Sequence, residues 1–464
     1  MKRLIFCFDG TWNKLVPDLA TNVVLTAASI SRIDPERIPQ LIHYDEGVGT
    51  SDLEQVRGGM FGYGLMGNVR EAYRFLVFNY DPGDEIYVFG FSRGAFSART
   101  FIGFIRHVGP LHRLHAGRID EALQLYEKRL KGKDGSADAM RRFRAMYSDK
   151  VCIGQEDEDW RCSNTPDYEA GSAPQMTIKY LGVWDTVDAL GLPDVLPGSD
   201  WFNREYDYHD ASLDGFVENA RHAVAIDERR KLFPVVPFDD IDGLNAVRGF
   251  ASEDKDAPYQ ERWFPGVHGS VGGGGDIRGL SDDALMWVLT GAKMAGLKLD
   301  TVRGTRIHGL RPDPLAPLVN ETDPEFSATA LIKGDRKGPK HLWQLSKSAV
   351  RRWRTTAEKL GGEAYRPDTL DEVSAELNGL GVWSFDPPTE LIAEEKVGIG
   401  DSLSKFAHKH YGDAELWPEI YEANRDRILD PDEIFPGLEV RIPRRSDSIE
   451  QPETLPIAGK NDDR

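Results

Sequence analysis

The chain of 464 residues carries a formal net charge of −19, from 57 basic and 76 acidic side chains. This acidic balance argues against nucleic-acid binding through phosphate neutralisation, so we expect no nucleic-acid partner. No apolar run approaches the roughly 20 residues that span a bilayer, which predicts no transmembrane segment. The three cysteines lack the CxxC spacing of zinc ligands, and we expect neither a bound metal nor a cofactor.

An apolar run at residues 3–8 predicts a first buried strand, followed at once by Asp9 and Gly10. Its apolar stretch is about five residues long, whereas the apolar core of a signal peptide has roughly 7–15. We therefore expect the protein to be made in the cytoplasm without a signal peptide.

Helical and strand patterns then alternate. Residues 68–80 carry apolar side chains at helical spacing, and residues 85–91 form the continuous apolar run typical of a parallel strand buried on both faces. Residues 92–109 return to helical spacing. This alternation predicts an α/β fold with a mostly parallel, doubly wound sheet.

Polar, helix-like sequence at residues 107–175 interrupts this pattern, and we interpret it as a helical insertion, with a lid as one alternative. The pattern then resumes with a strand at 175–187 and a helix at 214–230. Residues 262–276 read as a strand that leads into a Gly-rich loop, and residues 282–296 as another helix.

These patterns divide the chain into four parts. We assign residues 1–300 to a main domain and residues 301–392 to an irregular extension or linker that packs on it. A compact unit with its own helix caps follows at 393–445. The tail at 446–464 is predicted to be disordered.

The sequence Gly90-Phe91-Ser92-Arg93-Gly94 has the GxSxG pattern of a nucleophilic serine. The pattern alone is weak in a chain with 46 glycines, since a loop serine between two glycines also produces it. Here a buried strand precedes Ser92 and a helix follows it directly, which is the context of a nucleophile elbow. We therefore predict that Ser92 is a nucleophile.

A serine nucleophile needs a base and a carboxylate that orients it, and α/β-hydrolases carry them in the order Ser, acid, His. His268 follows an apolar strand and opens a Gly-rich loop, so we predict that it is the base. His222 falls in the helix predicted at 214–230, which suggests packing or capping instead. For the acid, Asp185 at the end of its strand is the first choice and Asp188 the second.

The oxyanion of a tetrahedral intermediate needs two hydrogen-bond donors. The backbone N–H of Arg93, at the start of a helix, is one candidate. The loop after the first strand supplies the other from Gly10 or Thr11, with Asp9 either bracing that loop or serving as a plain turn residue.

Six sequence blocks come in order over residues 1–300: FCFDGTWN, YDEGVGT, GFSRGAFSART, GVWDTVDALG, AIDERRKLFPVVPF and WFPGVHGSVGGG. Together they resemble the α/β-hydrolase domain of the Tle1-like phospholipase effectors of type VI secretion. The resemblance implies an α/β-hydrolase-like sheet and hydrolysis of phospholipid esters. It also places Ser92, Asp185 and His268 in the blocks that carry the family's triad, and implies export by a contractile secretion system.

Residues 400–443 resemble a LysM module, and a strand before Gly400 would complete a β-α-α-β unit. LysM modules bind glycans that contain N-acetylglucosamine, such as peptidoglycan, while similar units dock on proteins of contractile injection machines. Both alternatives stay open. The resemblance places the candidate glycan contacts in two loops: Gly400, Asp401, Ser402 and Leu403, and Ile434, Phe435, Pro436 and Gly437.

The main functional hypothesis is a serine ester hydrolase of phospholipase or lipase type that works through an acyl-enzyme, targeted by the LysM-like unit. The expected partners are a lipid or other ester substrate, and peptidoglycan or a secretion-machine component. The alternative from another class is a hydrolase fold that has lost catalysis and serves as a scaffold or docking protein of cell wall or secretion machinery. Peptidase or thioesterase chemistry on the same triad also stays open.

Overall fold

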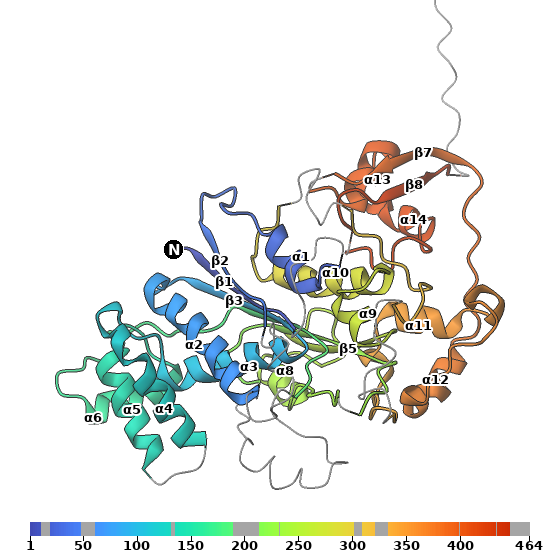
Figure 1. Cartoon of the computed structure of the whole chain (residues 1–464). Helices are drawn as coiled ribbons and strands as arrows, with labels where there is room; N and C mark the ends of the chain where they lie inside the picture. Colours follow the sequence, from blue (N-terminus) through green and yellow to red (C-terminus); the bar gives the residue numbers. More distant parts are fainter. Residues whose placement is uncertain are drawn as a thin grey trace, which may run out of the picture. The chain divides into compact units, whose positions relative to one another are not determined.

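The computed structural model describes residues 1–10, 19–47, 61–130, 135–188, 213–231, 233–300, 309–320, 333–398, 400–432 and 434–445. It forms two compact units, Met1–Ser384 and Phe385–Arg464 (Figure 1). The second unit thus begins eight residues before the position 393 expected from the sequence.

The first unit is built on a parallel sheet with the strand order β2-β1-β3-β4-β5-β6. The strands are β1 (Arg3–Phe8), β2 (Gln40–Asp45), β3 (Glu85–Phe91), β4 (Tyr180–Trp184), β5 (Ala220–Ala225) and β6 (Tyr259–Phe264). Each neighbouring pair is parallel, so all their carboxyl ends lie along one edge. The prediction of an α/β fold with a mostly parallel sheet is confirmed.

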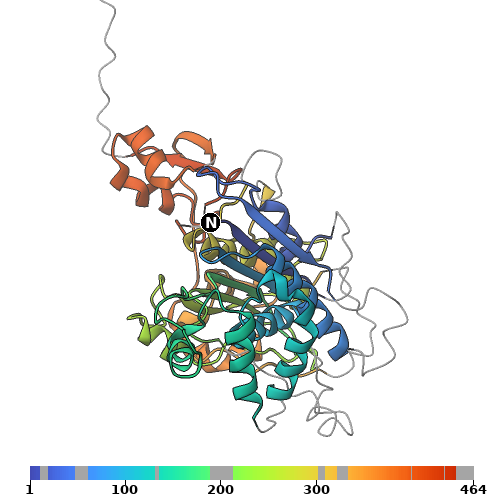
Figure 2. The same cartoon turned by 90° about the vertical axis from the view of Figure 1, so that its left-hand side faces the viewer.

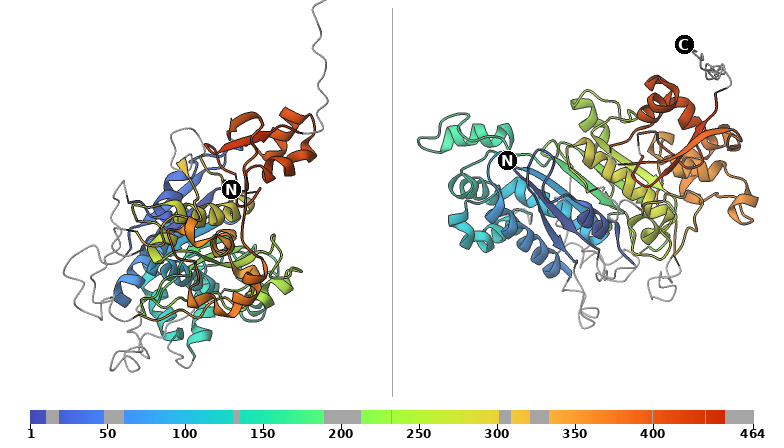
Figure 3. Two further views of the ribbon diagram at one scale, coloured as in Figure 1. Left: turned by 90° about the vertical axis from the view of Figure 1, so that its right-hand side faces the viewer. Right: turned by 90° about the horizontal axis from the view of Figure 1, so that it is seen from above.

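Helices cover both faces of this sheet (Figures 1 and 3). On one face, α2 (Phe61–Asn79) and α3 (Arg93–Val108) form a common core with Leu4, Phe6 and Phe8 of β1. On the other face lie α1 (Asn22–Ser29) and α10 (Gly279–Met294). With both faces covered, β1 and β3 are apolar without interruption, which is why the sequence reads as continuous apolar runs there.

The strand order reverses between β1 and β3, because the chain passes from β1 to β2 on one side and then to β3 on the other. Loops at such a reversal diverge and leave a crevice at the carboxyl edge, where α/β proteins bind their ligands. In this chain the loops in question begin at Asp9 and at Ser92. The topology therefore directs attention to the ends of β1 and β3.

The insertion contains α4 (Ile119–Leu130), α5 (Ser136–Tyr147) and α6 (Gly154–Asn164); α4 and α5 pack on α3, and α6 packs on α5 (Figures 1 and 2). The insertion begins after α3, which runs back from the carboxyl edge to the amino edge of the sheet. There Arg113 forms an ion pair at 2.7 Å with Asp81, which lies just before β3. The chain re-enters the sheet at the start of β4, on the same edge. Ser92 lies at the carboxyl edge, so this position argues against the lid alternative.

The helix expected at 214–230 is not found: Ala220–Ala225 forms strand β5, between β4 and β6. β5 is buried along its whole length, and apolar and polar side chains do not alternate along it, so the period-two pattern that distinguishes a strand from a helix is missing. Between β5 and β6 the chain forms α8 (Ile241–Val247).

The part of the extension that the structure describes is ordered and belongs to the first unit. It contains α11 (Lys347–Arg354), α12 (Ser374–Gly379) and the 3-10 turns η5 (Leu342–Gln344), η6 (Ala357–Leu360) and η7 (Asp368–Val373). Leu345 and Trp353 share a buried cluster with Val224 of β5 and Trp263 of β6. The Ser346 N–H donates to the Trp263 carbonyl at 2.9 Å, so the extension covers the edge of the sheet beside β6.

The second unit has the expected β-α-α-β order. Its elements are β7 (Leu391–Lys396), α13 (Leu403–Tyr411), the short turn η8 (Ala414–Leu416), α14 (Trp417–Glu422) and β8 (Glu439–Pro443). The two strands are antiparallel, and both helices pack on them through a small core of their own. The tail predicted to be disordered at 446–464 lies outside the described residues. In the described ranges, no helix combines the length and apolarity needed to cross a bilayer.

Candidate active site

Ser92 occupies the turn between β3 and α3 in a strained backbone conformation, with φ 59° and ψ −128°. A residue with a side chain rarely adopts this region, and such strain concentrates at functional sites. The turn is also crowded: a Cβ on Gly94 would lie 2.3 Å from the carbonyl oxygens of Phe8 and Asp9, and one on Gly90 would lie 2.6 Å from the Ala95 Cα. The two glycines of the motif therefore permit a turn that exposes the Ser92 hydroxyl to the carboxyl edge.

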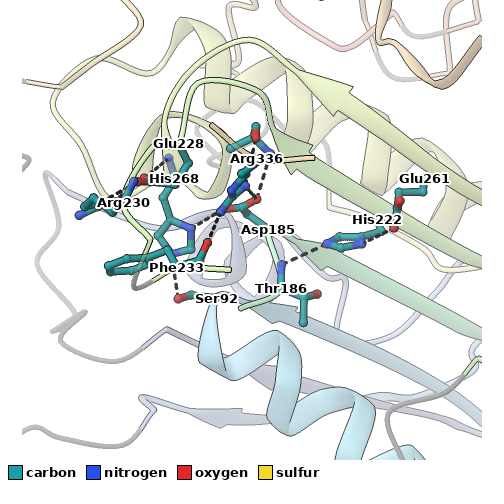
Figure 4. Close-up of polar contacts among 11 residues, drawn as sticks. Ser92, Asp185, Thr186, His222, Glu228, Arg230, Phe233, Glu261, His268 and Arg336 are labelled. Carbon is teal, nitrogen blue, oxygen red and sulfur yellow. Dashed lines mark hydrogen bonds and ion pairs between the residues drawn. The ribbon is translucent and has the colours of Figure 1, made fainter. Parts of the chain in front are cut away.

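The three residues of the predicted triad form one hydrogen-bonded chain (Figure 4). The His268 Nε2 lies 2.8 Å from the Ser92 Oγ, and its Nδ1 lies 2.5 Å from the Asp185 Oδ2. They come from the ends of β3, β4 and β6, with His268 as the first residue of the short helix α9 (His268–Gly272). Their exposed fractions are 4% for Ser92, 0% for Asp185 and 7% for His268, so the chain is almost dry.

Asp185 accepts three hydrogen bonds from two residues in addition to its contact with His268. The Arg336 guanidinium donates to both carboxylate oxygens, at 2.6 and 3.0 Å, and the Ala225 N–H donates at 2.9 Å. Burial alone would raise the pKa of the Asp185 carboxyl, but the Arg336 charge and the hydrogen bond from His268 hold that pKa well below its usual range. Asp185 is therefore an anion at neutral pH, as the orienting acid of a triad must be.

The position of His268 is set by one backbone hydrogen bond and by two aromatic rings. The His268 backbone N–H donates to the Glu228 carboxylate at 3.2 Å, and Glu228 forms an ion pair with Arg230. The Phe91 and Phe233 rings lie with centroids 4.6 and 5.0 Å from that of the imidazole. These contacts fix the plane of the ring, so that both nitrogens point along the triad.

A second imidazole–carboxylate pair, His222 with Glu261, contacts Thr186, the residue after Asp185. The His222 Nδ1 lies 2.9 Å from the Glu261 Oε2, and its Nε2 accepts the Thr186 N–H at 3.1 Å. Because Nε2 accepts, the ring proton lies on Nδ1 and is donated to Glu261. His222 thus has the packing role expected from the sequence, on strand β5 rather than on a helix, and it steadies the turn that carries Asp185.

The candidate oxyanion donors are only partly supported by the geometry. Arg93 is the first residue of α3, so its backbone N–H lies where the helix dipole favours an anion. Burial lowers the pKa of the Arg93 side chain to about 10. The Gly10 N–H, however, donates to the Asp9 Oδ1 at 2.7 Å, so its use for an oxyanion is not supported in this conformation. An aspartate often bonds the adjacent backbone in this way and competes for such donors. Thr11 lies outside the described residues.

Asp9 braces the loop after β1, in agreement with the first of the two interpretations made for it. Besides the Gly10 N–H, its carboxylate accepts the Thr21 hydroxyl at 2.7 Å and the Tyr44 hydroxyl at 2.8 Å. Burial and the Asp9 charge raise the pKa of Tyr44 well above its usual range, so this hydroxyl remains a donor. The bracing keeps the loop against Gly94 and the nucleophile turn.

A cleft of about 1000 Å³ borders this cluster. Phe233 and Arg336 line it and also contact His268 and Asp185, respectively. Asp188, the second choice for the acid, lines the same cleft, while the triad contacts are made by Asp185. Phe233 and Arg336 thus connect the wall of the cleft to the base and the acid of the site.

The two loops predicted to bind glycan are brought together in the second unit. The Gly437 N–H donates to the Val397 carbonyl at 2.8 Å, three residues before Gly400. Leu403 and Phe435 are 3% exposed, so their side chains belong to the core and are not available as glycan contacts. The Ser402 hydroxyl caps α13 by accepting the Lys405 N–H at 3.2 Å. The remaining candidates, Gly400, Asp401, Ile434, Pro436 and Gly437, stay predictions.

A parallel α/β sheet that carries a serine, an imidazole and a carboxylate in one hydrogen-bonded chain at its carboxyl edge has the arrangement of serine hydrolases. The chain belongs to the family described as "T6SS, Phospholipase effector Tle1-like, catalytic domain", which matches residues 2–291. The family resemblance inferred from the sequence blocks is thereby confirmed, and membership supports a hydrolase of lipase or phospholipase type.

Two curated relatives are similar to parts of the chain. "Uncharacterized protein YEL023C" of Saccharomyces cerevisiae is 29% identical over 252 residues, which are 51% of this chain and 33% of that protein. "Potassium binding protein Kbp" of Escherichia coli is 46% identical over 47 residues, which are 10% of this chain and 32% of that protein. The aligned part therefore spans about a third of the length of either relative.

Two solved structures are more distantly similar. An uncharacterized protein from Pseudomonas aeruginosa shares 18% identity at a TM-score of 0.35, over 64% of this chain and 46% of that one. The Tle1 effector bound to the VgrG spike of the type 6 secretion system shares 16% identity at a TM-score of 0.28, over 58% of this chain and 51% of that one.

Proposed function

We propose that the protein is a serine ester hydrolase that cleaves phospholipid or related lipid esters through an acyl-enzyme. The observation that carries the proposal is the hydrogen-bonded chain from Ser92 through His268 to Asp185, set on a strained strand–turn–helix. Membership of the Tle1-like phospholipase family supports the lipid ester as substrate class.

Each residue has one task in this reaction. The Ser92 Oγ attacks the acyl carbonyl while the His268 Nε2, 2.8 Å away, takes the hydroxyl proton. His268 then gives that proton to the departing alcohol, which leaves an ester of Ser92. Water attacks this ester with His268 again as base, and the acid and free Ser92 are released. Asp185 stabilises the imidazolium at both stages.

The test is hydrolysis of defined substrates by purified protein and by Ser92→Ala. A panel of phospholipids that differ in head group and labelled acyl position, together with simple p-nitrophenyl esters, covers the substrate classes. The proposal predicts release of fatty acid that is lost in Ser92→Ala, with the thermal unfolding temperature unchanged. A folded protein that hydrolyses none of them, or a Ser92→Ala variant with full activity, would contradict it.

For the second unit we propose a LysM-like targeting module. The β-α-α-β order and the meeting of the two predicted loops at Val397 and Gly437 support it. Peptidoglycan is the first candidate ligand. The alternative is docking on the secretion machine, which the family's association with type VI secretion favours and which would also account for export from the cytoplasm.

Sedimentation with insoluble peptidoglycan separates these two ligands. The full chain and a chain that ends at Ser384 are compared at equal concentration. Retention of the full chain alone supports glycan binding, whereas equal recovery of both in the supernatant contradicts it and favours docking on protein.

A further inference from the structure

Arg336 lies outside the part of the chain that matches the family, yet it makes the most extensive contacts with the acid of the site (Figure 4). Its two terminal nitrogens donate to both oxygens of Asp185, at 2.6 and 3.0 Å. The same nitrogens donate to the carbonyl oxygens of Ala225 and Phe233, at 3.0 and 2.8 Å. All four terminal N–H bonds of the guanidinium are thus engaged.

The three residues before Arg336 are anchored to the segment after β5, which fixes the position of the Arg336 side chain. Lys333 pairs with Arg230 as an antiparallel bridge, and the Gly334 N–H donates to the Arg229 carbonyl at 2.8 Å. Asp335 forms an ion pair with Arg229 at 2.9 Å. Beyond it, the chain continues to the cluster that packs the extension on β6. Arg336 is therefore delivered by an anchored segment, and its side chain is 6% exposed.

We propose that Arg336 is a positioning residue of the active site, and that the extension which carries it completes the catalytic unit by holding the Asp185 carboxylate ionised and oriented toward His268. The inference rests on the proposed function, since it concerns the same triad. The family match ends at residue 291, and the first unit ends at residue 384. By this inference the catalytic unit includes the residues between these two positions.

Charge and geometry both support this role. A fully buried carboxylate without a counter-charge would take up a proton, and a protonated Asp185 could not stabilise an imidazolium. A bidentate guanidinium also fixes the plane of the carboxylate, which a single point charge does not do. Among the described residues, the other charged and titratable groups around the pair include Glu228 with Arg230 at the His268 backbone, and His222 with Glu261, which His222 links to the Thr186 N–H.

The test compares Arg336→Gln, Arg336→Lys and wild type. Arg336→Gln removes the counter-charge of Asp185, so this carboxyl takes up a proton more readily and then no longer stabilises the imidazolium. The acidic limb of the pH profile of kcat/KM therefore moves to higher pH, by about one unit. We expect kcat to fall about 10²-fold with little change in KM, less than the roughly 10⁴-fold expected from removal of a triad carboxylate charge. Arg336→Lys restores the acidic limb but only part of kcat.

Arg352→Gln is the matched control. Arg352 is another buried arginine of the extension, and its guanidinium donates to the carbonyl oxygens of Pro314 and Ala316 at 2.8 and 2.7 Å. Its loss is expected to lower the unfolding temperature while leaving the pH profile in place. If Arg336 has only such a structural role, Arg336→Gln will behave like Arg352→Gln.

A measurement without substrate separates this inference from the proposed function. The titration of the Asp185 carboxyl is followed by ¹³C NMR on aspartate-labelled protein, with Asp185→Asn to assign the signal. The Arg336 charge holds the pKa of this carboxyl well below its usual range, and the inference predicts a midpoint about one pH unit higher in Arg336→Gln than in wild type. An unchanged midpoint overturns it, whatever the activity. A shifted midpoint in a protein that hydrolyses no ester would leave the inference standing and would contradict the proposed function alone.

Discussion

Replacement of Gly94 by alanine tests whether the turn that carries Ser92 depends on the close approach of β1. The new Cβ would lie 2.3 Å from the carbonyl oxygens of both Phe8 and Asp9. Phe8 ends strand β1, which pairs with β2 and β3, and Asp9 follows it directly, so these backbone atoms cannot swing away as a side chain would.

The size of the effect follows from that distance. Ordinary contact of a Cβ begins at 3.4 Å, so α3 and the end of β1 must separate by roughly 1 Å. Overpacking of this kind costs about 1–3 kcal/mol of stability. A displacement of about 1 Å at reacting groups lowers the rate about 10²-fold. Gly94→Ala should therefore lose about two orders of magnitude in kcat/KM while it still folds.

The assay is p-nitrophenyl ester hydrolysis together with thermal unfolding. Gly117→Ala is the control, since a Cβ on Gly117 meets nothing within 4 Å. Wild-type activity and stability in Gly94→Ala would refute the argument that contact between β1 and the turn sets the position of Ser92. Equal losses in both variants would refute it as well.

Three further predictions follow from buried polar groups. Asp185→Asn keeps the shape of the acid but leaves the Arg336 charge unpaired. We expect kcat to fall about 10⁴-fold in steady-state kinetics, and the free energy of unfolding to fall by about 3–5 kcal/mol in urea titrations. An unchanged free energy of unfolding would contradict the buried ion pair. Burial raises the pKa of Asp283 to about 6, with Ser348 bonded to it, so this carboxyl costs stability as the pH rises from about 4 to 6. Asp283→Asn should therefore raise the unfolding temperature at pH 7.5 more than at pH 4.5, and an equal effect at both would exclude the linkage. In the second unit, Asn424 is fully buried and makes hydrogen bonds at 2.7 Å, 2.7 Å and 2.8 Å; Asn424→Ala should cost about 2–4 kcal/mol there, seen as earlier loss of hydrogen-exchange protection in that unit alone.

The sequence predicted the parallel α/β sheet apart from strand β5, and it predicted three side chains that the structure joins by hydrogen bonds, because both depend on local pattern and chain order. The apolar run before Ser92 and the helix after it are short-range signals. Asp185 and His268 could be found because an α/β sheet delivers its functional side chains from the ends of successive strands. None of these steps requires knowledge of a contact between distant segments.

The features that the sequence did not predict have three different physical causes. Arg336 is 151 residues from Asp185 and lies in a segment without periodicity or motif, so only the folded chain shows that the two meet. Strand β5 was taken for a helix because apolar and polar side chains do not alternate along it. The bond from Gly10 to Asp9 is decided by the fold of one turn, where a side chain competes with the oxyanion for the same donor.

Covalent labelling tests the central claim, that Ser92 is a nucleophile activated by His268 and Asp185. The protein is treated with a fluorophosphonate at neutral pH, and the adduct is located by peptide mass spectrometry. We predict one adduct, on Ser92, absent in Ser92→Ala and formed far more slowly in His268→Ala. An adduct on another residue, or no adduct on a protein shown to be folded, would contradict the account.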